Sequence, residues 1–239
     1  MNDTETAPLF CLVPIRNGEP YLDAFFRCMR MLGASVIALD DGSTDRTREL
    51  LEGEPLVKRV LTNPVRPDFT GWDDFGNRTR LIEACADFAP RWILWLDVDE
   101  LIPDSDAPLL TDFLQTAADP DKCYGLEVLR MIGDANHFDR NKLWVYRLFA
   151  YRPGYSLPNE RLHFEPVPEQ IAQRDWIRTR LRILHFSSVS EAARAERYRK
   201  YEQADPDCEW QESYADILDE PGHIWELKPL PANRPIVIG

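Results

Sequence analysis

The sequence predicts an α/β fold in which a mixed, mainly parallel sheet is flanked by helices and followed by a helical and extended C-terminal extension. Short apolar runs that end in polar loops recur along the first hundred residues. Segments with apolar residues at helical spacing separate these runs. Strand–helix–strand units of this kind form parallel sheets with right-handed crossovers. At 239 residues, 44% of them hydrophobic, the chain is long enough to bury one large core.

The first predicted unit contains two buried strands and the helix between them. Apolar runs at 9–13 and 36–39 predict the strands, which end at Pro14 and at an acidic loop. Apolar residues between the two runs recur three and four positions apart, and Gly33 supplies the end of the helix.

The alternation continues to residue 96. Ser43 or Thr44 is expected to cap a short helix, and a strand follows near 60–61. A helix over about 77–88 leads into an apolar strand at 92–96. Because ligands of open α/β sheets bind at the carboxyl ends of strands, we expect the functional site at that edge.

In the second half of the chain, the sequence predicts a helix at 108–118 and strands at 124–130, 143–151 and 179–186. The last strand alternates in polarity, which places His185 at its end on the inward side.

The C-terminal part predicts one further helix and an extended tail. Ser188 with Glu191 has the spacing of a capping box for a helix that ends near residue 203. The proline-rich tail from Pro221 is expected to lack regular structure.

Composition restricts the class of protein. A net charge of −13 argues against nucleic acid and anionic lipid as partners. The five scattered cysteines lack a C-x-x-C pair, which indicates reduced core thiols. No apolar run approaches the roughly 20 residues of a membrane helix, and the N-terminus is acidic, so we expect a soluble cytoplasmic enzyme without an integral membrane segment. The sequence leaves the oligomeric state open.

An acidic cluster follows the apolar strand 92–96 directly. Carboxylates at the end of a buried strand must be solvated, paired or metal-bound. Asp97 and Asp99 are two positions apart and start on the same side of an extended chain. A divalent cation is a natural partner for them, while an acidic surface loop is the alternative.

Three ordered segments carry a family resemblance: LVPIRNGE at 12–19, LDDGSTDRT at 39–47 and WILWLDVDE at 92–100. Together they resemble the family-2 inverting glycosyltransferases, which have a GT-A, Rossmann-like fold. The resemblance implies an enzyme of hexosyltransferase type that uses a nucleotide-sugar donor, with a UDP-sugar expected.

The same resemblance implies a division of the chain into three parts. Residues 1–103 would bind the nucleotide-sugar, and 104–188 would bind the acceptor as the other half of one domain. Residues 189–239 would form the C-terminal helix and extension. The acceptor, whether a glycan, a lipid-linked molecule or a small molecule, stays unidentified.

The resemblance implies that Pro14, Arg16 and Glu19 line the nucleoside pocket. Asp40 and Asp41 would accept hydrogen bonds from the base and the ribose. A fixed carboxylate selects uracil, whose N3 is a donor, over cytosine, whose N3 is an acceptor. One of the two aspartates could instead serve only the turn.

The resemblance also implies Mn²⁺ or Mg²⁺ bound by Asp97, Asp99 and His185, with Asp97 near the donor as well. Arg78 could pair with the donor diphosphate. The alternatives are a core role for His185 and a solvated position for Arg78.

An inverting transfer needs one carboxylate as general base. The segment 159–166 resembles a His-Glu loop of some bacterial family members, and it favours Glu165 over Glu160 as the base. Either glutamate could instead pair with Arg161.

Two other functions are compatible with the sequence. The chain could be a catalytically silent module that binds a nucleotide-sugar and recruits a partner. It could also be a haloacid-dehalogenase-type phosphatase with Asp97 as nucleophile. That motif usually lies on the first strand, whereas three predicted strands precede Asp97 here.

Overall fold

A computed structural model of the chain describes residues 9–160, 162, 165–231 and 233–238, with only the backbone described at 140–142. The strands are β1 Leu9–Ile15, β2 Ser35–Asp40, β3 Val57–Thr62, β4 Trp92–Trp95, β5 Glu100–Leu101, β6 Cys123–Met131, β7 His137–Ala150, β8 Trp176–His185 and β9 Trp225–Glu226. The α-helices are α1 Glu19–Leu32, α2 Thr47–Gly53, α3 Asp74–Ala84, α4 Ala107–Thr116 and α5 Glu191–Ala204. Single 3₁₀ turns are η1 Cys85–Asp87, η2 Gln173–Asp175 and η3 Ala215–Leu218.

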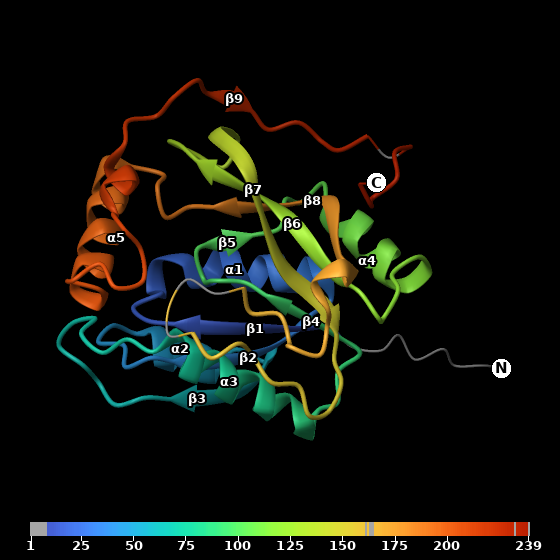
Figure 1. The fold of residues 1–239 in the computed structure, drawn as a ribbon, viewed down its shortest axis with the longest axis horizontal. Coiled ribbons are helices and arrows are strands. Elements are labelled where there is room, and N and C mark those ends of the chain that lie inside the picture. Colours follow the sequence, from blue (N-terminus) through green and yellow to red (C-terminus); the bar gives the residue numbers. More distant parts are fainter. Residues whose placement is uncertain (1–8, 161, 163–164, 232, 239) are drawn as a thin grey trace.

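The described strands form one mixed sheet in the order β3-β2-β1-β4-β7-β6-β8-β5, and β9 pairs with β7 (Figure 1). Strands β3, β2, β1 and β4 are parallel to one another. Strand β7 is antiparallel to β4 and β6, while β8 is parallel to β6. The predicted α/β fold with a mixed sheet is therefore confirmed.

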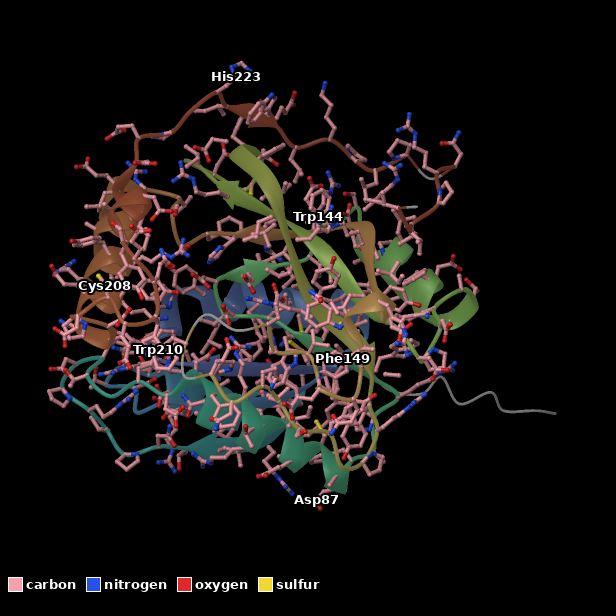
Figure 2. All side chains as sticks on the ribbon, in the orientation of Figure 1. Asp87, Trp144, Phe149, Cys208, Trp210 and His223 are labelled. Carbon is pink, nitrogen blue, oxygen red and sulfur yellow. The ribbon has the colours of Figure 1, made fainter. Side chains whose placement is uncertain are left out.

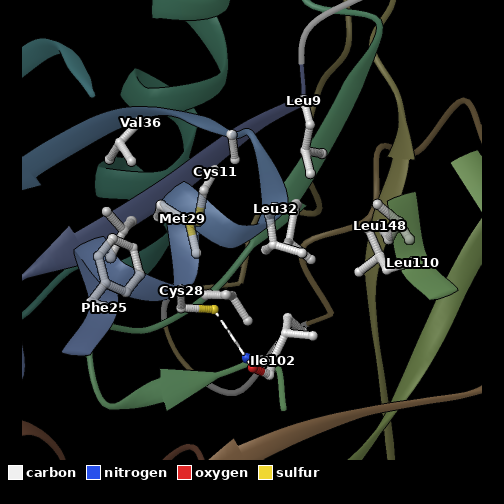
Figure 3. Close-up of a cluster of buried hydrophobic side chains, with 14 of the residues drawn as sticks. Leu9, Cys11, Phe25, Cys28, Met29, Leu32, Val36, Ile102, Leu110 and Leu148 are labelled. Atoms are coloured by element: carbon white, nitrogen blue, oxygen red, sulfur yellow. Dashed lines mark hydrogen bonds between the residues drawn. The ribbon is translucent and has the colours of Figure 1, made fainter. Parts of the chain in front are cut away.

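Two apolar layers bury the parallel strands β1, β2 and β4 from both sides. Side chains of α1 and α4 share one core cluster with Cys11 and Val13 of β1. Phe10 and Leu12 of the same strand belong to the other cluster, together with side chains of α3. Figure 3 shows the first cluster, in which Cys28 contacts the backbone of Ile102. Burial on both faces explains why these strands read as continuous apolar runs.

Helix α1 ends where the sequence predicts. Gly33 has φ +61°, a left-handed conformation that glycine adopts without a Cβ clash, and its N–H donates to the Arg30 carbonyl. No described helix combines the length and the apolarity needed to cross a membrane.

The predicted cap of α2 is wrong. The helix begins at Thr47, after Arg46, without a side-chain cap. Ser43 and Thr44 bond instead to Asn17 in the loop after β1: Ser43 Oγ accepts from the Asn17 N–H at 2.9 Å, and the Thr44 N–H donates to Asn17 Oδ1 at 2.8 Å. Ser43 and Thr44 therefore bond to a distant loop instead of capping the helix.

The predicted starts of α3 and α5 also need correction. Asp73 caps α3 by accepting from the Gly76 N–H at 2.9 Å, so this helix starts three residues before the predicted position. Ser190 caps α5 by accepting from the Ala193 N–H at 3.1 Å. Ser188, the predicted cap, is buried instead.

The tail has more regular structure than expected. Strand β9 pairs with β7 at Phe138 and Trp225, and Val237 forms a bridge with Thr179 of β8. In Figure 1 the tail crosses the top of the view, above β7 and β8. The prolines limit regular pairing but leave the remaining N–H groups free to bond to the sheet.

Candidate active site

Loops after β1, β2 and β4 meet at the carboxyl edge of the parallel strands. The Asp41 N–H, just beyond β2, donates to the Ile15 carbonyl at the end of β1 at 2.7 Å. A Cβ at Gly18 would lie 3.2 Å from side-chain carbons of Val98, between the two predicted aspartates. Gly18 therefore permits close contact between the loop after β1 and residues 97–100, which are called the acidic turn below.

The loop after β1 interlocks with the loop after β2. The Gly18 N–H donates to Thr47 Oγ1 at 2.7 Å. Glu19 Oε2 accepts from the Arg46 N–H at 3.1 Å. Glu19 thus holds the second loop in place, while Pro14 lies half-buried at the end of β1.

Asp40 and Asp41 have different partners, although both are buried. Asp40 Oδ1 accepts from the Ser43 N–H at 3.0 Å and so serves the turn. Asp41 contacts the Arg66 guanidinium and accepts from Asn63 Nδ2 at 2.6 Å. Asp41 therefore faces the loop after β3.

Gly42 permits close contact between the loop after β2 and the loop after β3. Its φ is +75°, and a Cβ there would lie 2.3 Å from the Pro64 carbonyl oxygen. Both the backbone conformation and the space require glycine at this position.

Arg16 fixes the loop after β3. Its guanidinium donates to the Asp68 carbonyl and, at 2.6 Å, to the Arg66 carbonyl. It also lies 4.4 Å from the centre of the Phe69 ring. Arg16 therefore shapes the wall of the predicted nucleoside pocket through backbone contacts.

Two arginines hold Asp97. Arg78 Nη2 donates to Asp97 Oδ1 at 2.9 Å, and Arg147 Nη2 lies 3.8 Å from Asp97 Oδ2. Arg147, on β7, also contacts the buried carboxylate of Glu100, which accepts from the Asp97 N–H at 2.9 Å. Burial raises the pKa of Asp97, but Arg147 and Arg78 outweigh burial and hold that pKa well below its usual range.

Arg78 is 5% exposed, so its expected alternative as a solvated helix-start residue is wrong. Its Nε donates to Asp74 Oδ2 at 2.8 Å, one turn earlier on α3. Its neighbour Asn77 accepts from Asn63 Nδ2 at 2.8 Å, and Asn63 also contacts Asp41. Side-chain hydrogen bonds therefore run from Asp41 through Asn63 to Asn77, and the next residue along α3, Arg78, bonds to Asp97.

Asp99, the second aspartate of the acidic turn, lies beside His185 at the end of β8. His185 Nε2 lies 3.6 Å from Asp99 Oδ2, because the pairing of β5 with β8 sets Glu100 opposite His185. Burial raises the pKa of Asp99, whereas His185 lowers it, and the net pKa is lowered. Within the described part of the chain, no three His, Cys, Asp or Glu side chains are gathered as a metal site.

The donor set at Asp99 still fits Mn²⁺ or Mg²⁺. These ions use one or two carboxylates together with substrate phosphates, and imidazole is acceptable to Mn²⁺. Asp99 and His185 are together, whereas Asp97 faces guanidinium groups. Asp99 and His185, together with phosphate oxygens of the nucleotide-sugar, therefore fit a metal ion better than the predicted set of Asp97, Asp99 and His185.

The two candidate bases lie in different surroundings. Glu165 is half-buried, and its Oε2 accepts from the Tyr146 N–H at 3.0 Å. Burial raises the pKa of Glu165, which the Tyr146 N–H and Arg147 oppose. Glu160 is exposed, and the expected alternative partner Arg161 lies outside the described residues.

The sequence analysis missed Arg147, Asn63 and Arg66. Arg147 is the one charged residue of the apolar run 143–150 within β7, where an arginine must find buried partners, so its position was a signal. Asn63 and Arg66 are ordinary polar residues of the loop after β3, and only the tertiary arrangement identifies them.

Parallel strands extended by antiparallel ones, with an acidic turn after β4, have the arrangement of the GT-A class of glycosyltransferase folds. A family model described as Glycosyl transferase family 2 matches residues 10–178, and the chain belongs to this family. Family membership removes the phosphatase interpretation.

Individual proteins also resemble the chain. An uncharacterized protein of Mycobacterium tuberculosis is 24% identical over 220 residues, which cover 83% of this chain and 51% of that protein. An uncharacterized protein of Mycobacterium bovis matches to the same extent. The chain therefore spans about half the length of the curated relatives it matches.

A solved structure shows a likeness in fold. The structure of S. aureus TarS 1-349 has a TM-score of 0.50 at 14% identity, with 88% of this chain and 69% of that chain covered. Glucosyl-3-phosphoglycerate synthase from Mycobacterium tuberculosis, solved with Mn²⁺ and UDP-glucose, has a TM-score of 0.35 at 19% identity, covering 52% of this chain and 44% of that one.

Proposed function

We propose that the protein is a metal-dependent glycosyltransferase that transfers a sugar from a UDP-sugar to an acceptor hydroxyl with inversion. One observation carries this proposal. At the carboxyl edge of the parallel strands, the Asp99–His185 pair lies beside an Asp97 held by two arginines, and Asn63 bonds both Asp41 and the Asn77 that precedes Arg78 on α3. Family membership supports the class of reaction.

Residues 1–103 would bind the donor. Asp41 and the loop held by Arg16 offer a carboxylate and backbone groups to a uracil base and a ribose. S. aureus TarS, which the chain resembles in fold, has also been solved with UDP-GlcNAc, and this supports the choice of a UDP-sugar.

Asp99 and His185 would hold the divalent ion. When bound, the ion supplies positive charge that stabilises the departing diphosphate. Asp97, kept ionised by Arg78 and Arg147, would orient the turn and the donor beside it. Glu100 fixes the backbone of the turn through the Asp97 N–H.

Glu165 would act as the general base, with Glu160 as the second choice. Burial raises the pKa of Glu165, which makes this carboxylate a stronger base than an exposed one. Glu165 would take the proton of the acceptor hydroxyl as that oxygen bonds to the anomeric carbon. The bond from this carbon to the diphosphate oxygen breaks in the same step, which inverts the configuration. Residues 104–188 would bind the acceptor.

Asp99→Ala tests the donor site. We expect this variant to lose Mn²⁺-dependent binding of UDP, measured by titration calorimetry, and to keep its circular dichroism spectrum. Asp104→Ala, which removes an exposed carboxylate near the same turn, is the matched control. Unchanged UDP affinity of Asp99→Ala in the presence of Mn²⁺ would refute the proposed site.

Glu165→Gln tests the base. We expect UDP affinity to persist while transfer, or hydrolysis of a UDP-sugar, falls by roughly 10²-fold or more. Glu160→Gln should retain turnover. The reverse result would move the base to Glu160, and tight UDP binding without transfer or hydrolysis by the wild type would indicate the silent module.

A further inference from the structure

Helix α5 lies across the interval between the end of β8 and the loop that follows β3 (Figure 1). In its second turn, Arg197 Nη1 donates to Ser187 Oγ at 3.1 Å, just after β8. Four residues farther, the Tyr201 ring lies 6.0 Å from the Trp72 ring in the loop after β3. One face of α5 therefore borders both the Asp99–His185 pair and the wall of the predicted nucleoside pocket.

Lys200 lies on this part of α5, and aromatic rings fix its ammonium group. Its Nζ is 4.0 Å from the centre of the Trp72 ring, 5.5 Å from that of Phe69 and 5.7 Å from that of Tyr201. No carboxylate oxygen of the described residues lies within 4.0 Å of this nitrogen. Ring faces attract a cation without accepting its N–H groups as a carboxylate does, so the donors of Lys200 stay available.

The charge of Lys200, held against the Trp72 ring, acts on both aspartates of the acidic turn. Burial raises the pKa of Asp97 and of Asp99, and the charge of Lys200 is among those that lower both. Arg78 and Arg147, the neighbouring cations, are already bonded to carboxylates. Lys200 is therefore a cation beside the acidic turn that has aromatic partners instead of an acidic one.

We propose that Lys200 binds the diphosphate of the nucleotide-sugar donor, an inference that rests on the proposed function. A diphosphate that links a base near Asp41 to an ion at Asp99 would carry its charge past the end of α5. Lysine binds phosphate as a point charge, and the rings of Phe69 and Trp72 hold this one in place. On a chain with net charge −13, such a cation is needed to offset repulsion of the anionic donor.

The test compares UDP with uridine by titration calorimetry in MnCl₂. We expect Lys200→Met to weaken UDP binding by about 10- to 100-fold, as for a lost hydrogen bond to a charged group. Uridine, which lacks phosphate, should bind both proteins alike. Lys200→Arg should retain most of the affinity for UDP, and Arg199→Met, which removes an exposed neighbouring cation, should match the wild type.

The outcomes separate this inference from the proposed function. If wild-type protein binds UDP and Lys200→Met binds it within twofold, Lys200 is not a diphosphate ligand and the proposed function stands. If wild-type protein binds none of UDP, GDP, ADP and CDP with Mn²⁺, both fail. Thermal melting of Lys200→Met checks that the variant is folded. If it is not, Lys200→Gln, which also removes the charge, replaces it in the same comparison of UDP with uridine.

Discussion

Arg147 joins two carboxylates that would otherwise repel each other inside the protein. Glu100 is 2% exposed and contacts Arg147, while Asp97 lies on the other side of the same guanidinium. Burial raises the pKa of Glu100, and Arg147 opposes that effect. A buried charge of either sign is costly alone, so the three groups depend on one another.

Arg147→Met tests this dependence. Because the variant leaves Glu100 buried without a cation, we expect the free energy of unfolding to fall by about 3–5 kcal/mol in urea titrations. Adding Glu100→Gln to Arg147→Met should recover part of the loss, since the neutral amide would need no counter-charge while its oxygen still accepts from the Asp97 N–H. Additive effects of the two changes would show that the pair is not coupled.

At the scale of elements, the sequence predicts strands better than helix starts. Residues of β1, β2 and β4 are buried on both faces, and continuous apolar runs reveal such strands. Caps failed because Ser43 and Thr44 bond across to Asn17, which local spacing does not show. The same limit applies to the site: Asp97 and Asp99 were visible at a strand end, whereas their cationic partners come from distant elements.

The end of α5 depends on Asp205, which is buried. Its Oδ1 accepts from the Glu209 N–H at 2.7 Å, and its Oδ2 accepts from the Trp210 N–H at 3.1 Å and the Tyr214 hydroxyl at 2.6 Å. Burial raises the pKa of Asp205, but these hydrogen bonds outweigh it and lower that pKa below the usual value. The carboxylate therefore stabilises the fold above its unfolded-state pKa of about 3.9, and this contribution is lost as pH falls through the folded-state pKa.

Asp205→Asn should therefore reduce the free energy of unfolding by roughly 1–3 kcal/mol at neutral pH. The difference from the wild type should shrink as the pH falls below about 4. Urea titrations at several pH values measure both effects. Asp207→Asn, at an exposed position nearby, is the control, and a difference that did not change with pH would contradict the role of the ionised group.

At the scale of the whole molecule, two apolar layers enclose the sheet and account for most of the cysteines. Cys11, Cys28, Cys85 and Cys123 are buried, as the sequence predicts for core thiols. Cys208 is exposed and lies on the C-terminal extension (Figure 2), so the prediction of a core thiol is wrong for this cysteine. Burial raises the pKa of all four core thiols, that of Cys28 to about 11.

Because the thiolate is the reactive form, we expect one fast-reacting thiol per folded chain. Labelling with a thiol-specific disulfide reagent at pH 8 should modify Cys208 within minutes, and all five cysteines after denaturation. Cys208→Ser should abolish the fast phase. A second fast thiol in the folded variant would mean that one of the core layers opens.

The interlocked loops after β1 and β2 bear on the thermodynamics of ligand capture. Asn17, Gly18 and Glu19 are bonded to the second loop before any ligand arrives. Ordering a loose backbone costs about 1–2 kcal/mol per residue, and in these residues that entropy is already lost when the chain folds. A ligand entering this edge meets a preorganised wall, so more of its contact energy appears as affinity.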